Sequence, residues 1–289
     1  MKDVKQVVQW LNDELRTYLE RLHAPETLKE AMKYSLLAGG KRIRPLLIFA
    51  TLEAFQKPPS LGLPVACAVE MIHTYSLIHD DLPAMDDDDY RRGKLTNHKV
   101  FGEATAILSG DALLTYSFQV LAEAASIPTE RKLQLIAELA RAAGPEGMVA
   151  GQIADLAAEN KQVDLEQLEY IHLHKTGKLL AFCIKAGAIL AGADELTIKK
   201  MDEFAHHIGL AFQIRDDVLD IIGSTEQMGK RAGSDVSKNK RTYPKLLTLE
   251  GAKEKLNDHL DLALEILNQL PLDTRRLKEL TELIVHRAN

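Results

Sequence analysis

Apolar residues recur at three- and four-residue spacing along most of this chain, and this spacing decides its fold class. The pattern is clear over residues 130–141, 165–172 and 199–222, where it marks one apolar face of an α-helix. No stretch keeps the strict alternation of a β-strand for long. Glycine and proline pairs, such as Gly144-Pro145, separate the periodic segments. The sequence therefore predicts an all-α protein.

The chain reads as one domain, over residues 1–289. Its 289 residues are 46% hydrophobic, which is enough to build a large core. We find no long linker rich in Pro, Ser or Gly between the periodic segments, and no repeat of fixed period.

Composition narrows the possible partners and the location. A net charge of -6 argues against nucleic-acid binding, which usually requires a basic face, so a small-molecule partner is expected. The two cysteines are too few for a disulfide framework. The first residues are charged and lack the features of a secretory signal, and the longest apolar tract, 179–193, is too short to cross a bilayer. We expect a cytoplasmic protein without a transmembrane segment.

Two clusters of aspartate follow or interrupt apolar helices. Six aspartates lie within residues 80–89, directly after an apolar helix over 65–78. A second cluster, Asp216-Asp217-Val218-Leu219-Asp220, lies inside another apolar helix, where positions 216 and 220 are one turn apart on the same face. Carboxylates placed so closely repel each other unless a cation lies between them.

Oxygen ligands without histidine or thiolate indicate Mg²⁺, with Mn²⁺ as a substitute. Protein sites hold Mg²⁺ with one or two carboxylates together with substrate phosphates, so the implied substrate is a polyphosphate. A single acidic motif is as often plain solvated surface as a metal site. Two motifs on apolar helices favour the metal.

A polyphosphate site also needs cations, because two carboxylate clusters alone would repel the substrate. The chain offers a basic loop after Gly39-Gly40, an Arg-Arg pair behind the first acidic cluster, and isolated lysines further on. The candidates are Lys41, Arg44, Arg91, Arg92, Lys175, Lys230 and Lys240. The glycine pair is not a nucleotide-binding P-loop, since the Gly-Lys-Ser/Thr ending is missing.

Taken together, these motifs resemble the short-chain trans-prenyl diphosphate synthases, most closely the bacterial members that make farnesyl diphosphate. The resemblance runs along nearly the whole chain. It rests on the motifs GGKRIRP at 39–45, EMIHTYSLIHDD at 70–81, RRG at 91–93, GMVAGQ at 147–152, KTG at 175–177, FQIRDDVLD at 212–220 and GSD at 233–235.

The resemblance implies a single large helical bundle around a deep central cavity, a homodimer, and three Mg²⁺ ions. It assigns the metal ligands to Asp80, Asp86 and Asp216, with Asp81, Asp217 and Asp220 in supporting positions. The allylic diphosphate would contact Arg91, Lys175, Thr176, Gln213, Lys230 and Lys240. Isopentenyl diphosphate would contact Lys41, Arg44, His73 and Arg92.

The implied reaction joins isopentenyl diphosphate to dimethylallyl or geranyl diphosphate and yields farnesyl diphosphate. The allylic diphosphate ionises, the isopentenyl double bond attacks the cation, and a proton is lost. Lys175, Thr176 and Gln213 would be the catalytic residues, with Thr176 and Gln213 steadying the cation through their oxygen dipoles.

The family resemblance implies that Tyr75 and its neighbour Ser76 control the product length. Tyr75 is an aromatic residue five positions before the first motif. An ideal helical wheel places Ser76 and Leu77 closer to the aspartate face than Tyr75. The wheel therefore gives this assignment no independent support, and Tyr75 could be a core aromatic residue.

Three alternatives stay open at this point. Within the class, the chain could make geranyl or geranylgeranyl diphosphate. A terpene cyclase would share the first motif, but its second motif mixes Asn, Ser or Thr with Glu, unlike the segment 216–220. A non-catalytic subunit of a synthase would be expected to lose one motif or the basic set, and this chain keeps both.

Overall fold

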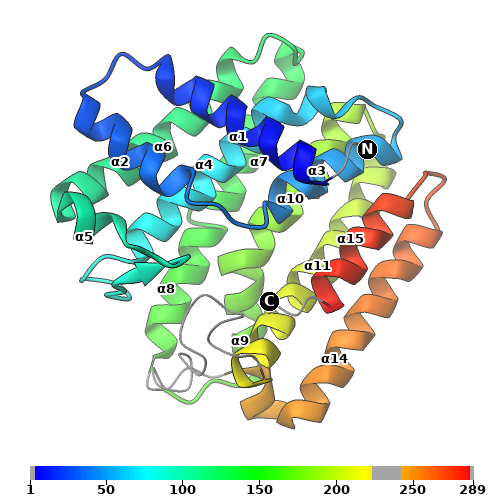
Figure 1. Cartoon of the computed structure of the whole chain (residues 1–289). Helices are drawn as coiled ribbons and strands as arrows, with labels where there is room; N and C mark the ends of the chain where they lie inside the picture. The colour runs from blue at the N-terminus through cyan, green and yellow to red at the C-terminus, as the bar shows by residue number, and fades with distance from the viewer. Residues whose placement is uncertain (1–3, 160, 223–241, 287–289) are drawn as a thin grey trace. The chain divides into compact units, whose positions relative to one another are not determined.

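The computed structural model describes residues 4–159, 161–222 and 242–286 (Figure 1). The helices are α1 Val4–Glu20, α2 Glu26–Leu36, α3 Ile43–Ala54, α4 Leu63–Asp80, α5 Asn97–Phe101, α6 Glu103–Glu123, α7 Thr129–Ala143, α8 Met148–Ala158, α9 Leu165–His172, α10 Lys178–Ala191, α11 Glu195–Ile222, α14 Tyr243–Asn268 and α15 Arg275–His286. The predicted all-α class is confirmed. Lys230, Lys240 and the GSD motif at 233–235 lie outside the described residues.

Within those residues, the only strands form a small hairpin after the first acidic cluster. Strand β1 (Tyr90–Arg91) pairs antiparallel with β2 (Lys94–Leu95). Two short helical turns complete the elements: the 3-10 turn η1 (Pro59–Gly62) and the π-helical segment η2 (Leu173–Gly177). The sequence did not predict the hairpin, because two-residue strands are too short to show alternation.

The chain divides into two compact units, and α3 and α7 each run from one unit into the other. The first unit comprises Met1–Leu46 and Ser60–Ile136, and the second comprises Leu47–Pro59 and Ala137–Asn289. The first acidic cluster belongs to the first unit and the second cluster to the second unit. The single domain of the sequence analysis stays a prediction.

Helix α4 is the central helix of the first unit and packs along α6. Pro64 lies in its first turn, where a missing amide hydrogen costs nothing. Apolar residues surround the helix on all sides, so that Val65–Val69 are all fully buried. Unlike the tract 179–193, the stretch Pro59–Asp80 is long and apolar enough to pass for a membrane span, but 72% of its apolar 18-residue window is buried inside the protein.

In the second unit, α11 lies beside α14 and α10 (Figure 1). Its apolar stripe, which includes Leu210, Ile214 and Val218, packs against Tyr243 and Leu256 of α14. Each fully buried side chain of this size contributes about 1.5–3 kcal/mol. This packing fixes the long helix that carries the second acidic cluster.

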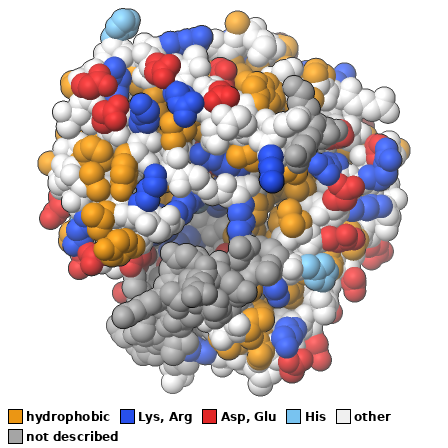
Figure 2. All heavy atoms as spheres, in the orientation of Figure 1, with side chains coloured by type: hydrophobic (Ala, Val, Ile, Leu, Met, Phe, Trp, Pro, Cys, Tyr) orange, Lys and Arg blue, Asp and Glu red, His pale blue; other side chains and the backbone are white. Residues whose placement is uncertain are grey.

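Charged side chains of both signs are interspersed on the face shown in Figure 2. This mixture agrees with the formal net charge of -6.

Candidate active site

The first acidic cluster begins where α4 ends. Asp80 is the last residue of α4 and Asp81 is its C-cap, so negative side chains lie at the carbonyl end of a helix, where the helix dipole disfavours them. The chain then folds back, and the backbone N–H of Asp86 donates to the carbonyl oxygen of Asp80 at 2.8 Å. Asp80 and Asp86 are therefore spatial neighbours despite the five residues between them, and a bound cation would relieve their repulsion.

Asp81 turns away from that position and holds the hairpin. Its carboxylate accepts two hydrogen bonds from Nε of Arg91, at 2.7 and 2.9 Å, and lies 2.6 Å from the Nη2 atom of Arg91. Burial raises the pKa of Asp81, and the Arg91 hydrogen bond acts in the opposite direction. Asp88 adds a second acidic neighbour, 3.8 Å from Arg91. The side chain of Arg91 is thus fixed at the first motif.

The hairpin turn brings Arg92 against the glycine pair of the basic loop. Arg92 and Gly93 have φ angles of 55° and 74°, the left-handed values that a two-residue hairpin turn of type I′ requires. Arg92 donates to the carbonyl oxygen of Gly39. A Cβ atom on Gly40 would lie 2.7–2.9 Å from the Arg92 guanidinium, and the φ of 118° at Gly40 favours glycine at this position.

Arginine side chains surround His73 of α4. Burial, followed by the charges of these arginines, lowers the pKa of His73 well below its usual value, and the arginines are Arg44, Arg92, Arg91 and Arg42. The predicted isopentenyl contacts Arg44, His73 and Arg92 therefore share one electrostatic environment in the first unit. Lys41 belongs to the same loop and is exposed.

Arg42 fixes the basic loop, and the sequence analysis did not select it. Its side chain is 2% exposed and pairs with Glu70 of α4, which is 3% exposed. The guanidinium also donates to Asn12 at 2.9 Å and to the carbonyl oxygen of Leu36 at 2.7 Å. The signal was present in the sequence, because Glu70 opens the motif that contains His73.

The second acidic cluster lies in the last two turns of α11, and its members differ in burial. Asp216 is exposed, whereas Asp217 and Asp220 are 5% and 4% exposed. The carboxylate of Asp217 accepts the backbone N–H of Tyr243 at 2.9 Å. The first aspartate of this motif is therefore available to solvent and ligands, and the second is committed to the interior.

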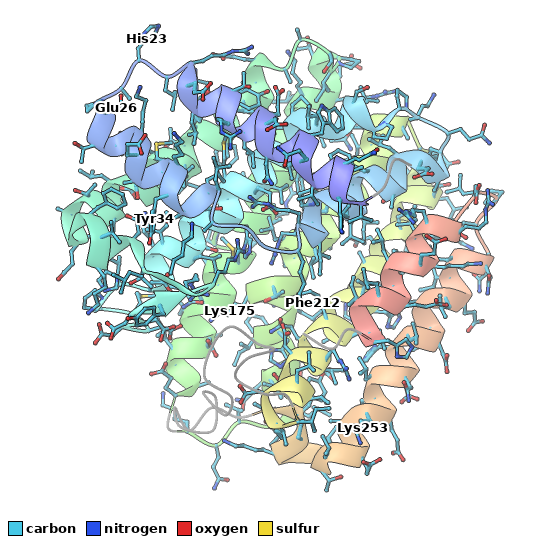
Figure 3. The ribbon with its side chains drawn as sticks, viewed as in Figure 1. His23, Glu26, Tyr34, Lys175, Phe212 and Lys253 are labelled. Carbon is cyan, nitrogen blue, oxygen red and sulfur yellow. The ribbon has the colours of Figure 1, made fainter. Side chains whose placement is uncertain are left out.

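Both the side chain and the backbone of Lys175 contact α8. It projects from the π-helical segment η2 (Figure 3), and its Nζ atom lies 2.7 Å from Asp155. Its backbone packs so closely on Gly151, one helical turn before Asp155, that a Cβ atom there would clash with it. π-Helical turns occur frequently at functional sites. Thr176 belongs to the same segment and is half-buried.

Tyr75 is 8% exposed and packs edge-on against His79, with 5.7 Å between ring centroids. The His79 ring occupies the space that a Cβ atom on Gly110 of α6 would need. Burial, and then the charge of Asp80, raises the pKa of Tyr75. Ser76 is half-buried, and its hydroxyl donates to the carbonyl oxygen of His73 at 2.9 Å.

The oxygen donors fit a hard cation that binds together with its substrate. Among the described residues, no group of three or more His, Cys, Asp or Glu side chains could hold a metal ion without other ligands. Mg²⁺ does not require such a cage, because it completes its shell with water and phosphate oxygens. The assignment of Asp80, Asp86 and Asp216 as metal ligands stays a prediction.

Comparison with known proteins gives one consistent result. The family model for polyprenyl synthetases matches residues 25–284. Farnesyl diphosphate synthase from Geobacillus stearothermophilus is 58% identical over 97% of this chain and 98% of its own length. The enzyme of the same name from Bacillus subtilis (strain 168) is 57% identical over 96% and 94%. A solved FPP/GFPP synthase from Zymomonas mobilis matches with a TM-score of 0.87 and 39% identity, covering 98% of this chain and 99% of that one.

Proposed function

The chain belongs to the polyprenyl synthetase family, and we propose that it condenses isopentenyl diphosphate with dimethylallyl and geranyl diphosphate to form farnesyl diphosphate. The observation that carries this proposal is the 58% identity to a bacterial farnesyl diphosphate synthase over nearly the full length of both chains. The retention of both acidic motifs and the basic set supports an active enzyme rather than a non-catalytic subunit. The all-Asp second motif speaks against a terpene cyclase.

Prenyl diphosphate synthases use a divalent metal ion, and we propose Mg²⁺ held by Asp80, Asp86 and Asp216. When bound, the ions would neutralise charge on the leaving diphosphate and favour its departure. The oxygen-only donor set supports this assignment.

The residues around the motifs divide into two sets. Arg91 and Lys175, with Lys230 and Lys240, would bind the allylic diphosphate, and Lys41, Arg44, His73 and Arg92 would bind isopentenyl diphosphate. The hydroxyl of Thr176 and the amide of Gln213 would face the allylic cation with their oxygen dipoles. No side-chain nucleophile is required, and the departing diphosphate would accept the proton that is lost. Arg42, held by Glu70, would keep the isopentenyl set together.

A product assay tests this proposal directly. The purified protein is incubated with isopentenyl diphosphate, each allylic starter and Mg²⁺, and product length is read by chromatography. We expect fifteen-carbon products that disappear with excess EDTA and return with Mg²⁺. Twenty-carbon or ten-carbon main products would show a geranylgeranyl or geranyl synthase instead, and full activity in EDTA would contradict the metal role. Cytoplasmic location and the homodimer stay predictions, the latter to be tested by sedimentation.

Product length is a separate part of the proposal, with Tyr75 as the floor of the chain-binding cavity. Tyr75→Ala removes the ring and should give products of twenty carbons or more. Tyr75→Phe is the matched control, because it keeps the ring and should still stop at fifteen. Active Tyr75→Ala enzyme that stops at fifteen carbons would place the floor elsewhere.

A further inference from the structure

Four side chains of the second unit form a buried chain of contacts beside the second acidic motif. Gln213 and Asp217 come from α11, His172 ends α9, and Tyr243 begins α14. His172, Asp217 and Tyr243 are 7%, 5% and 0% exposed. None of the assigned roles uses His172 or Tyr243.

Asp217 joins two other elements to α11. One of its oxygens, Oδ2, accepts the backbone N–H of Tyr243 at 2.9 Å and lies 3.2 Å from Nε2 of His172. The first amides of a helix have no partner within the helix, and Thr242, the N-cap of α14, makes no side-chain capping bond. Asp217 therefore caps α14 from α11, which turns its carboxylate away from Asp216.

These contacts select one arrangement of protons on His172. Its Nε2 faces a carboxylate oxygen, which can only accept, so in the neutral imidazole Nε2 carries the proton and donates. The other ring nitrogen, Nδ1, is then left as an acceptor for the Gln213 amide, whose Nε2 lies 3.5 Å away. The proton positions follow from the hydrogen-bond network in this way.

The orientation of the Gln213 amide follows from that arrangement. An acceptor on His172 requires the NH₂ end of the amide to face the ring. The carbonyl oxygen of Gln213 then points away from His172, and its negative dipole is available to a cation. The His172 ring itself is held by Tyr243, which stacks on it with 5.7 Å between centroids and an angle of 15°. The Tyr243 hydroxyl donates to Glu169 at 3.1 Å, which fixes the hydroxyl end of the Tyr243 side chain.

We propose that His172 is a positioning residue that orients the Gln213 amide for the prenyl-transfer reaction, and that Asp217 is its anchor rather than a metal ligand. This inference rests on the proposed function, because it needs Gln213 to face the allylic cation. It assigns different tasks to the adjacent residues Asp216 and Asp217.

His172→Phe tests the orienting role, because phenylalanine keeps the ring that stacks on Tyr243 and loses both nitrogens. We expect kcat with geranyl diphosphate to fall about ten- to a hundredfold, which corresponds to one charged or polar contact in the transition state. The KM for isopentenyl diphosphate should change less than twofold. His172→Gln is the second variant, and it should recover part of the loss if its side chain restores an acceptor toward Gln213.

A double-mutant cycle separates orientation from general packing. If His172 acts through Gln213, then His172→Phe combined with Gln213→Ala should be no slower than Gln213→Ala alone, within about twofold. Multiplied losses in the double variant, or a His172→Phe enzyme with wild-type kcat, would overturn the proposal. Thermal unfolding of each variant shows that the compared enzymes are folded.

Metal titration tests the anchor. Asp217→Asn keeps an acceptor oxygen for Tyr243 and His172, so the Mg²⁺ concentration for half-maximal activity should stay within about twofold of wild type. Asp216→Asn should raise it more than tenfold. An equal rise in both variants would make Asp217 a ligand and overturn its role as an anchor. Failure of the proposed function would appear differently, as wild-type protein that forms no prenyl product.

Discussion

The two acidic motifs differ in surroundings but divide their work in the same way. In the first, on the loop after α4, Asp81 is paired with the charged Arg91. In the second, inside α11, Asp217 contacts a backbone amide and an imidazole ring. In both motifs the second aspartate is buried and tied to the following element, the hairpin or α14. The first aspartate, Asp80 or Asp216, has the larger exposed fraction.

This comparison shows that an acidic motif is not a uniform set of ligands. In each motif the buried carboxylate fixes the polypeptide, and the more exposed one is the predicted metal ligand. The two units also use different interactions to hold their sites: the first relies on a buried ion pair, Arg42 with Glu70, and the second relies on hydrogen bonds around His172. Substitutions of the first aspartates should therefore act alike, whereas substitutions of the groups that hold each site should give different results in the two units.

Replacing the first aspartate of either motif should have the largest effect. Asp80→Asn or Asp216→Asn removes a proposed metal ligand, and metal-assisted charge neutralisation is worth several kcal/mol, so we expect kcat/KM to fall by about a thousandfold or more. Circular dichroism should show both variants folded. A variant of either residue with near-normal activity at low Mg²⁺ would contradict the shared role.

Breaking the ion pair of the first unit should have the next largest effect, and it should act on stability. Arg42→Met leaves Glu70 buried without its partner, which costs about 3–5 kcal/mol. Chemical denaturation measures this loss. Arg16→Met is the matched control, because Arg16 is about half exposed and its pair with Asp13 is weak. Equal stability of the two variants would show that the pair does not hold the basic loop.

Much of the fold and of the candidate site could be predicted from the sequence. The apolar periodicity over residues 199–222 correctly predicted the helix of the second motif, and the two acidic clusters with their basic partners indicated a metal and polyphosphate site. The tertiary contacts of the aspartates could not be predicted. For example, the burial of Asp217 depends on Tyr243, which is 26 residues away. Arg42 and Asp155 were missed for the same reason: their partners are distant in sequence. The hairpin was missed because its strands have only two residues each.

One residue from each substrate set, Lys175 of the second unit and Arg92 of the first, provides a kinetic comparison between the units. A charged hydrogen bond to phosphate is worth about 1.5–3 kcal/mol. Lys175→Ala in the second unit should therefore weaken productive use of the allylic substrate about ten- to a hundredfold, and Arg92→Ala in the first unit should act chiefly on isopentenyl diphosphate. Lys178→Ala is the control near Lys175, since Lys178 is exposed. If both variants affected both substrates equally, the assignment would be wrong.

The smallest effect concerns pH, and a pair of histidines in the second unit should contribute to it. There α11 and α14 meet through two histidines, His207 and His259, whose Nδ1 atoms lie 3.0 Å apart. One ring must donate to the other, so at least one of the two is neutral, and Nε2 of His259 is buried without a hydrogen-bond partner among the described residues. Burial, followed by the nearby charges of His207 and Lys255, lowers the pKa of His259 to about 4. Burial and then His206 also lower the pKa of His207.

A histidine with a lowered pKa in the folded state binds fewer protons than it does in the unfolded chain, so stability should fall with the pH. The loss begins near the ordinary value of about 6.5 and is complete below about 4. For His259 it amounts to about 2 kcal/mol between pH 7 and pH 5. Denaturation at both pH values measures it, and His259→Leu should remove most of the difference. His23→Asn, at an exposed position of the first unit, is the control and should keep the wild-type slope. If His259→Leu kept that slope as well, the acid sensitivity would have to arise from other groups with a lowered pKa, such as His73 of the first unit.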